Sequence, residues 1–183
     1  ASSKLAFNMS EAAKRQLNFW LEVADAGAPT TSTFLRPSTA MVADASIVAH
    51  CDWGFSKKHQ QGWGVYVLSH DIYASAPVPD IFVHRCVGAA GNPSSPALEA
   101  WGAVFAVRTV KHLVRNKVIL LFTDNVPFIQ AFHKCSSPSA PTAEALQGLS
   151  LFQIKFSCLI ILRYVPTEDN LSDPLSRNEF QNF

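Results

Sequence analysis

Val118-Ile119-Leu120-Leu121-Phe122-Thr123-Asp124 is a continuous apolar run that ends on a threonine and an aspartate. A strand that is covered on both faces has this composition, because neither face needs alternating polar side chains. We therefore predict that the run is a central strand of a sheet, with Asp124 at its carboxyl end. Ligands gather at the carboxyl ends of strands in open sheets, so Asp124 is a candidate functional residue.

The segments after this strand alternate between helix and strand patterns. We predict a short helix from about Asn125 to Lys134, a helix from Thr142 to about Phe156, a buried strand Leu159–Tyr164 and a polar tail from Thr167 to Arg177. Such alternation is typical of parallel strands that are joined by helical crossovers.

Three strand patterns precede the central strand. Ile47–Asp52 is an apolar run that ends on an acid, Gly62–Leu68 follows a polar turn, and Ile81–Val87 alternates between apolar and polar residues. Their spacing is that of hairpins, so we expect antiparallel pairing. A long helix then begins with Ser94 or Ser95 as its N-cap and extends to about Arg115.

These elements predict an α/β fold with a mixed five-stranded sheet, in which three antiparallel strands are followed by parallel additions and helices pack on the sheet. Before the sheet, the residues from Glu11 to about Ala24 have the apolar spacing of a helix, and a loop rich in Pro, Thr and Ser follows. We therefore divide the chain into an N-terminal helix and linker, residues 1–40, and a sheet domain, residues 41–183.

The composition excludes several function classes. The chain has 183 residues, of which 16% are charged, and a formal net charge of +1, so charge alone does not provide nucleic-acid binding. Its four cysteines form no CxxC pair and therefore no zinc signature. The apolar runs are far shorter than a membrane span and no signal peptide is visible, so we expect an intracellular protein without membrane contact.

Four carboxylates lie at the ends of the predicted elements. Asp52 ends the first strand, Glu99 is in the first turn of the long helix, Asp124 ends the central strand, and Asp173 lies at the start of the last helix. Clustered carboxylates repel one another unless a cation neutralises them or their pKa values shift. Each acid alone is more often structural, but the ordered set favours a functional cluster, which is either a metal site or a set of acids with strongly shifted pKa values. Two magnesium ions held by such carboxylates could stabilise the attacking and leaving oxygens when a phosphodiester is cleaved.

At these residues the chain resembles the ribonuclease H domain of reverse-transcribing elements, most like the Gypsy-type and DIRS-type families, over about Ile47 to Arg177. Asp52 precedes Gly62-Trp63-Gly64 at the family's spacing, and Leu98-Glu99-Ala100-Trp101 and Phe122-Thr123-Asp124-Asn125 match its next two acidic motifs. The tail fits the family pattern at every fixed position and is the most specific match: Val165-Pro166-Thr167-Glu168-Asp169-Asn170-Leu171-Ser172-Asp173-Pro174-Leu175-Ser176-Arg177.

The resemblance implies a metal-dependent endoribonuclease that cleaves the RNA strand of RNA–DNA hybrids. Its catalytic residues and metal ligands, for two Mg²⁺ or Mn²⁺ ions, would be Asp52, Glu99, Asp124 and Asp173. A reverse transcriptase polymerase domain in the same polyprotein would be its partner, and the N-terminal helix resembles the one that links polymerase to nuclease. The candidate substrate contacts are Lys57, Lys58, Asn125, Asn170 and Arg177.

Three alternatives remain open from the sequence. Asp44, within Val42-Ala43-Asp44-Ala45-Ser46, competes as the first acid, but the spacing to Gly62 favours Asp52. The domain could instead be a non-catalytic ribonuclease H-like scaffold or a nucleic-acid-binding module, because one fold serves many functions. A DNA strand-transfer enzyme is the third alternative, and four acids rather than three argue against it.

The chain departs from the family pattern at three places: directly after the first acid, in the loop before the last acid, and in the region before the last strand. Trp53-Gly54 follows the first acid, where cellular ribonucleases H have Gly-Ser. Those enzymes also have a histidine in the loop before the last acid, whereas Pro166–Ser172 contains none. No basic substrate-binding protrusion lies between Asp124 and Leu159. We therefore expect weak substrate binding by the isolated chain.

Overall fold

The structure, a computed structural model, describes residues 11–25, 45–56, 60–88 and 91–179. Its elements are α1 Glu11–Asp25, β1 Ile47–Ser56, β2 Gln60–Val67, β3 Ile72–Pro77, α3 Asp80–Arg85, α4 Ser95–Thr109, β4 Val118–Thr123, α5 Val126–Lys134, α6 Ala140–Phe156, β5 Leu159–Tyr164, a 3₁₀ turn Thr167–Asp169 and α7 Asp173–Ser176. Asp44 and the predicted boundary near residue 40 lie outside the described residues, so the division into two parts stays a prediction.

The five strands form one mixed sheet in the order β3-β2-β1-β4-β5. β1, β2 and β3 pair antiparallel, whereas β4 runs parallel to β1 and β5 runs parallel to β4. The predicted architecture is therefore confirmed. The apolar run that predicted a central strand forms β4, which lies between β1 and β5 and buries Ile119, Leu120 and Leu121.

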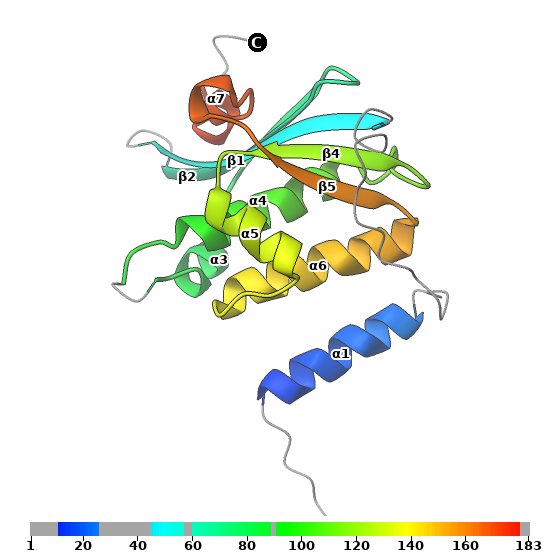
Figure 1. Cartoon of the computed structure of the whole chain (residues 1–183). Coiled ribbons are helices and arrows are strands. Elements are labelled where there is room, and N and C mark those ends of the chain that lie inside the picture. The colour runs from blue at the N-terminus through cyan, green and yellow to red at the C-terminus, as the bar shows by residue number, and fades with distance from the viewer. Residues whose placement is uncertain (1–10, 26–44, 57–59, 89–90, 180–183) are drawn as a thin grey trace, which may run out of the picture.

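Helices cover the two faces of the sheet unequally. α4, α5 and α6 lie on one face, α7 lies on the other, and α1 lies against α6 (Figure 1). The main core fills the space between the first face and its helices, with Ile47, Ala49 and Cys51 of β1 pointing into it. Side chains alternate along a strand, so Asp52 and Gly54 lie on the opposite face, where α7 packs.

The prediction of a third strand at Ile81–Val87 is wrong. Asp80–Arg85 forms the helix α3, and the third strand is Ile72–Pro77. A short apolar run does not distinguish strand from helix by its periodicity, and here Pro79 as the N-cap and Asp80 in the first turn favour the helix.

Helix α4 ends at Thr109, before the predicted Arg115, because Val110 leaves helical geometry with ψ at 15°.

Among the described residues, no helix is both long and apolar enough to cross a membrane.

Candidate active site

Three carboxylates from three elements come together beside the carboxyl end of β4. Asp52 lies in β1, Glu99 lies in α4, and Asp124 directly follows β4. One oxygen of each carboxylate lies within 4.8 Å of the other two. Asp52 is 2% exposed and Glu99 is 3% exposed, whereas Asp124 is partly buried. We call these three residues the acid cluster.

The strand register brings Asp52 and Asp124 to the same level. β1 and β4 run parallel, and their last paired residues are His50 and Phe122. Each acid lies two residues beyond its member of that pair, so the two side chains lie side by side on one face. Contrary to the prediction, Asp52 does not end its strand, because β1 continues to Ser56 as a partner of β2. Asp52 therefore lies two residues beyond the end of the parallel pairing.

Glu99 reaches the acid cluster because α4 passes close to β1. A Cβ atom at Gly102 would lie 3.2 Å from Cδ1 of the Trp63 ring and 3.4 Å from the carbonyl oxygen of Asp52, so a glycine at this position favours the close packing of α4 on β1 and β2. The backbone amide of Trp53 donates a hydrogen bond to the Glu99 carboxylate. Glu99 lies after the first turn of α4, not within it as predicted.

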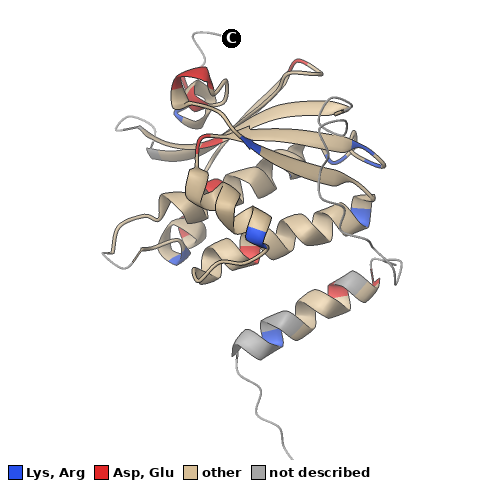
Figure 2. Cartoon of the chain, viewed as in Figure 1, with Lys and Arg blue, Asp and Glu red and all other residues tan. Residues whose placement is uncertain are grey.

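Burial and mutual repulsion disfavour the ionised form of the acid cluster. Burial is the main cause that raises the pKa of Asp52 to about 7; the Ser176 hydrogen bond opposes the rise, and the Asp124 charge adds to it. Burial also raises the pKa of Glu99 well above its ordinary value, and the charges of Asp52 and Asp124 add to this. In Figure 2, acidic segments of β1, α4, the end of β4 and α7 lie near one another.

The acid cluster fits a hard divalent cation. Its donors are carboxylate oxygens, the ligands that Mg²⁺ and Mn²⁺ prefer. Glu99 Oε2 is buried and has no hydrogen-bond partner among the described residues. A buried oxygen without a partner is costly in a fold, and a bound cation would satisfy it.

Asp173 lies near the acid cluster but outside it. The residue begins α7, as predicted, and its charge raises the pKa of both Asp52 and Glu99, though less than burial does. It is not among the three acids whose oxygens lie within 4.8 Å of one another. Its Oδ1 accepts a hydrogen bond from Arg177 at 2.6 Å, so the fourth acid is paired with a cation.

The tail that contains α7 lies directly on three glycines of β1 and β2. Gly54 and Gly62 are paired across the two strands, and Gly64 lies two residues further along β2. A Cβ atom at Gly62 would lie 2.3 Å from the carbonyl oxygen of Ser176, and one at Gly64 would lie 2.5 Å from that of Ser172. Only residues without a side chain allow this approach, and we call the three the glycine surface.

Two of the predicted substrate contacts, Asn125 and Asn170, make hydrogen bonds within the fold. Asn125 caps α5, since its side chain accepts from the Phe128 amide. Asn170 is 3% exposed; its side chain donates to the carbonyl oxygen of Cys51 and accepts from the hydroxyl of Ser172. Both side chains therefore hold the segments around the acid cluster in place.

The three predicted cationic contacts differ in what the structure describes. Arg177 pairs with Asp173; its side chain is 42% exposed, and its Nε is buried without a hydrogen-bond partner among the described residues. Lys57 and Lys58 lie outside the described residues.

Two hydroxyl groups that contact the acids were not predicted. Ser176 donates to Asp52 Oδ2 at 2.6 Å, and Thr167 donates to Asp124 Oδ2 at 2.6 Å. Ser176 occupies a fixed position of the tail pattern, so the pattern itself contained a signal for it. Thr167 occupies a variable position of the pattern, and nothing in the sequence indicated its contact.

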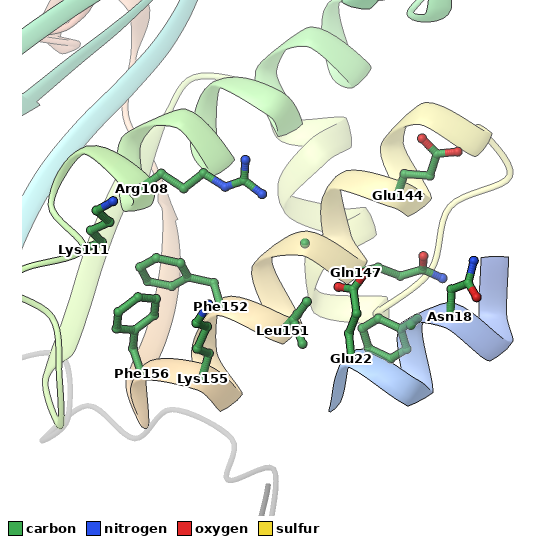
Figure 3. A pocket seen from close by; sticks show the side chains of 12 residues that line it. Asn18, Glu22, Arg108, Lys111, Glu144, Gln147, Leu151, Phe152, Lys155 and Phe156 are labelled. Atoms are coloured by element: carbon green, nitrogen blue, oxygen red, sulfur yellow. The ribbon is translucent and has the colours of Figure 1, made fainter. Parts of the chain in front are cut away.

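A cavity of about 680 Å³ lies between α1, α4 and α6, and no residue of the acid cluster lines it. Arg108, Lys111 and Lys155 lie toward one end of this cavity, and Glu144 and Gln147 lie toward the other (Figure 3). Its walls are therefore mixed in charge, and the cavity is separate from the acid cluster.

The sequence matches no protein-family model and no curated protein, but solved structures match the fold. Ribonuclease H1 from the halophilic archaeon Halobacterium salinarum NRC-1 aligns with a TM-score of 0.53 and 13% identity, over 75% of this chain and 98% of that chain. LC11 ribonuclease H1, solved in complex with an RNA/DNA hybrid, aligns with a TM-score of 0.56 and 13% identity, over 72% of this chain and 94% of that chain.

A foamy viral protease-reverse transcriptase, also solved in complex with an RNA/DNA hybrid, aligns with a TM-score of 0.50 and 13% identity, over 85% of this chain. This chain spans only 22% of the length of that viral chain. Identities this low establish the fold and not the activity. The chain has a ribonuclease H-like fold, which confirms what the sequence resemblance implied about its architecture.

Proposed function

We propose that the chain is a metal-dependent endoribonuclease that cleaves the RNA strand of RNA–DNA hybrids. The observation that supports this is the acid cluster, whose three carboxylates lie within 4.8 Å of one another on a ribonuclease H-like fold. Burying carboxylates without a compensating charge is costly, so a cluster of this kind is typical of a metal site.

The residues of the chain would hold the metal and orient the scissile phosphate. Asp52, Glu99 and Asp124 would be the principal ligands, and Asp173 would add a fourth carboxylate. When bound, two Mg²⁺ or Mn²⁺ ions stabilise both the attacking and the leaving oxygen of the phosphodiester cleavage. β1, α4 and the end of β4 fix the relative positions of the carboxylates, and correct geometry of this kind lowers the barrier substantially.

The RNA–DNA hybrid is the proposed substrate because two of the similar structures were solved with one bound. A protein distinguishes RNA from DNA by contacts with the 2′-hydroxyl group. Lys57, Lys58 and Arg177 are the proposed phosphate contacts, since cationic side chains provide most contacts with nucleic-acid backbones. We assign Asn125 and Asn170 to holding the site, because their side chains are hydrogen-bonded within the fold.

We also propose that the chain works beside a reverse transcriptase polymerase domain in one polyprotein. The similarity to a viral chain that contains protease and reverse transcriptase supports this, with 22% of that chain aligned. Residues 1–40, with α1, would then be the connection between polymerase and nuclease.

The test is cleavage of a hybrid with a labelled RNA strand by the purified chain in Mg²⁺ or Mn²⁺. We expect cleavage that excess chelator abolishes, and Glu99→Gln should reduce the rate at least about 100-fold because a metal ligand is lost. Glu22→Gln, the same change at an exposed acid of α1, is the matched control and should leave the rate unchanged.

Two outcomes would contradict the proposal. Undiminished cleavage in excess chelator would exclude the metal mechanism. A folded chain that binds the hybrid but never cleaves it, even with a polymerase domain supplied, would favour a non-catalytic nucleic-acid-binding module.

A further inference from the structure

The hydroxyl group of Ser176, in helix α7 of the C-terminal tail, lies next to the carboxylate of Asp52, the first acid. It donates to Asp52 Oδ2 at 2.6 Å and lies 2.8 Å from the carbonyl oxygen of Asp173. Ser176 is only 2% exposed, so bulk water does not compete for these contacts. One serine therefore links an acid of β1 to the helix that contains the fourth acid.

The hydroxyl group has one hydrogen, so its two acceptors compete for it. Asp52 Oδ2 is the nearer acceptor, and it bears charge when the acid is ionised. Hydrogen bonds to a charged acceptor are roughly twice as strong as those to a neutral one. The hydrogen therefore points to Asp52 in its ionised form, which is the form that binds a metal.

Close packing fixes the position of this hydroxyl group. A Cβ atom at Gly54 would lie 2.2 Å from Ser176 Oγ, and one at Gly62 would lie 2.3 Å from the carbonyl oxygen of Ser176. Main chain thus lies against both the side chain and the backbone of Ser176. The contact with Asp52 is therefore set by the way α7 packs on the glycine surface.

We propose that Ser176 is a positioning residue for the metal centre: its hydroxyl group holds the Asp52 carboxylate in the orientation that binds the metal. The inference rests on the proposed function, because it takes the acid cluster to be that metal centre. The C-terminal tail then contributes both an acid, Asp173, and a donor that orients an acid on another element. Ser176 acts through Asp52 and contacts neither metal nor substrate.

The test is a titration of the full chain with Mn²⁺. The paramagnetic resonance signal of free Mn²⁺ measures the binding, and this signal does not depend on cleavage. Ser176→Ala should weaken Mn²⁺ binding at least about tenfold, which is the lower end of the typical effect of removing a hydrogen-bond partner of a metal ligand. Ser150→Ala is the matched control. It also removes a serine hydroxyl group that donates to a backbone carbonyl, that of Leu146 within α6, but it donates to no acid, so Mn²⁺ affinity should be unchanged.

A double-variant cycle separates positioning from general destabilisation. Asp52→Asn alone should weaken Mn²⁺ binding, and adding Ser176→Ala to it should cause less than about a twofold further loss, because the two residues act as one unit. A second, full tenfold loss in that background would show that Ser176 does not act through Asp52, and it would overturn the proposal.

The remaining outcomes are also decisive. A wild-type chain that binds no Mn²⁺ overturns the metal centre and, with it, this inference. A wild-type chain that binds Mn²⁺, with Ser176→Ala indistinguishable from Ser150→Ala, overturns the role of Ser176 alone. If circular dichroism shows that Ser176→Ala is unfolded, Ser176→Cys, which has a weaker donor, is titrated in its place, and unchanged affinity again overturns the role.

Discussion

Asp52 and Glu99 are carboxylates that the fold buries almost completely, at 2% and 3% exposure. Burial is the main reason that the pKa of each is raised, so in the metal-free chain both hold protons at a pH where exposed acids have lost them. A metal that binds these oxygens must displace the protons, so we expect metal affinity to increase with pH. The burial that hinders ionisation also strengthens the attraction to a divalent cation.

The metal-free chain should become less stable as the pH rises toward neutrality. Folding raises the pKa of Asp52 from 3.8 to about 7, so between these values the folded chain binds more protons than the unfolded chain. The free energy of unfolding falls as the pH rises wherever this holds. Once the pH is above the folded-state pKa, the total loss from this shift is at most about 4 kcal/mol. Denaturant unfolding in chelator at about pH 5 and about pH 8 measures the difference.

Two controls identify the groups responsible for this loss. Asp52→Asn removes the titrating carboxylate and should reduce the pH dependence, and saturating Mg²⁺ should restore stability at the higher pH. A metal-free chain that gains stability between the two pH values would show that burial does not dominate the ionisation of Asp52.

The identity of the first acid is tested by two matched substitutions. Asp52→Asn should reduce hybrid cleavage at least about 100-fold, because a ligand of the catalytic metal is lost. Asp44→Asn should be nearly silent, since Asp52 is the residue that lies with Glu99 and Asp124. The reverse result in the same assay would assign the role of first acid to Asp44.

At the scale of elements, the packing of α7 on the glycine surface places the tail beside the acids. Gly64→Ala would put a Cβ atom 2.5 Å from the carbonyl oxygen of Ser172 and 2.5 Å from the amide nitrogen of Ser176. The tail must move, which we expect to cost about 1–3 kcal/mol of stability. Displacement of Asp173 and Ser176 should also reduce hybrid cleavage at least about 100-fold, because misplacement by about 1 Å has effects of this size.

Gly148→Ala is the matched control for this substitution. A Cβ atom there would have only an ordinary contact, at 3.8 Å, with a methyl group of Val104. Gly148 lies within α6, where alanine favours the helix by about 0.5–1 kcal/mol, so the variant should be slightly more stable and fully active. Thermal unfolding and initial cleavage rates of both variants provide the comparison. Equal activity of the two would show that α7 does not help to form the site.

Elements with a strong apolar pattern could be predicted from the sequence, and elements with a weak pattern could not. β4 and β5 consist mainly of branched and aromatic residues; β5 has the predicted bounds, and β4 ends one residue before the predicted Asp124. β3 contains Tyr73-Ala74-Ser75-Ala76-Pro77, and alanine, serine and proline have low strand propensity. It forms a strand because β2 supplies its hydrogen-bond partner, and an edge position tolerates the proline.

The same contrast holds for the candidate site. Asp124 and Asp173 lie where local patterns predicted them, at a strand end and at a helix start. Whether they approach Asp52 depends on the pairing of β1 with β4 and on the packing of the tail, both of which join distant parts of the chain. The contacts of Ser176 and Thr167 with the acids depend on that same packing, so local sequence patterns could not predict them.

At the scale of the whole molecule, the distribution of cations limits nucleic-acid binding. Over the part of the chain that the structure describes, Lys and Arg are scattered and do not gather around the acids (Figure 2). Arg177 lies close to the acids but pairs with Asp173, and Arg163 donates to the carbonyl oxygen of Leu162. With a formal net charge of +1, the chain has few charges to offer a phosphate backbone.

Binding of the isolated chain to a hybrid should therefore be weak and only shallowly dependent on salt. Each phosphate contact on a duplex contributes a slope of about −0.9 in log K against log salt. If Lys57, Lys58, Arg163 and Arg177 each neutralise at most one phosphate, we expect a slope of magnitude about 2 to 4 from titrations at several salt concentrations. A slope nearer roughly −8 would reveal an extended basic surface and would remove the need for a polymerase domain in substrate binding. The expected slope would mean that few phosphates are neutralised, and the proposed polymerase domain would then add to the affinity for the hybrid.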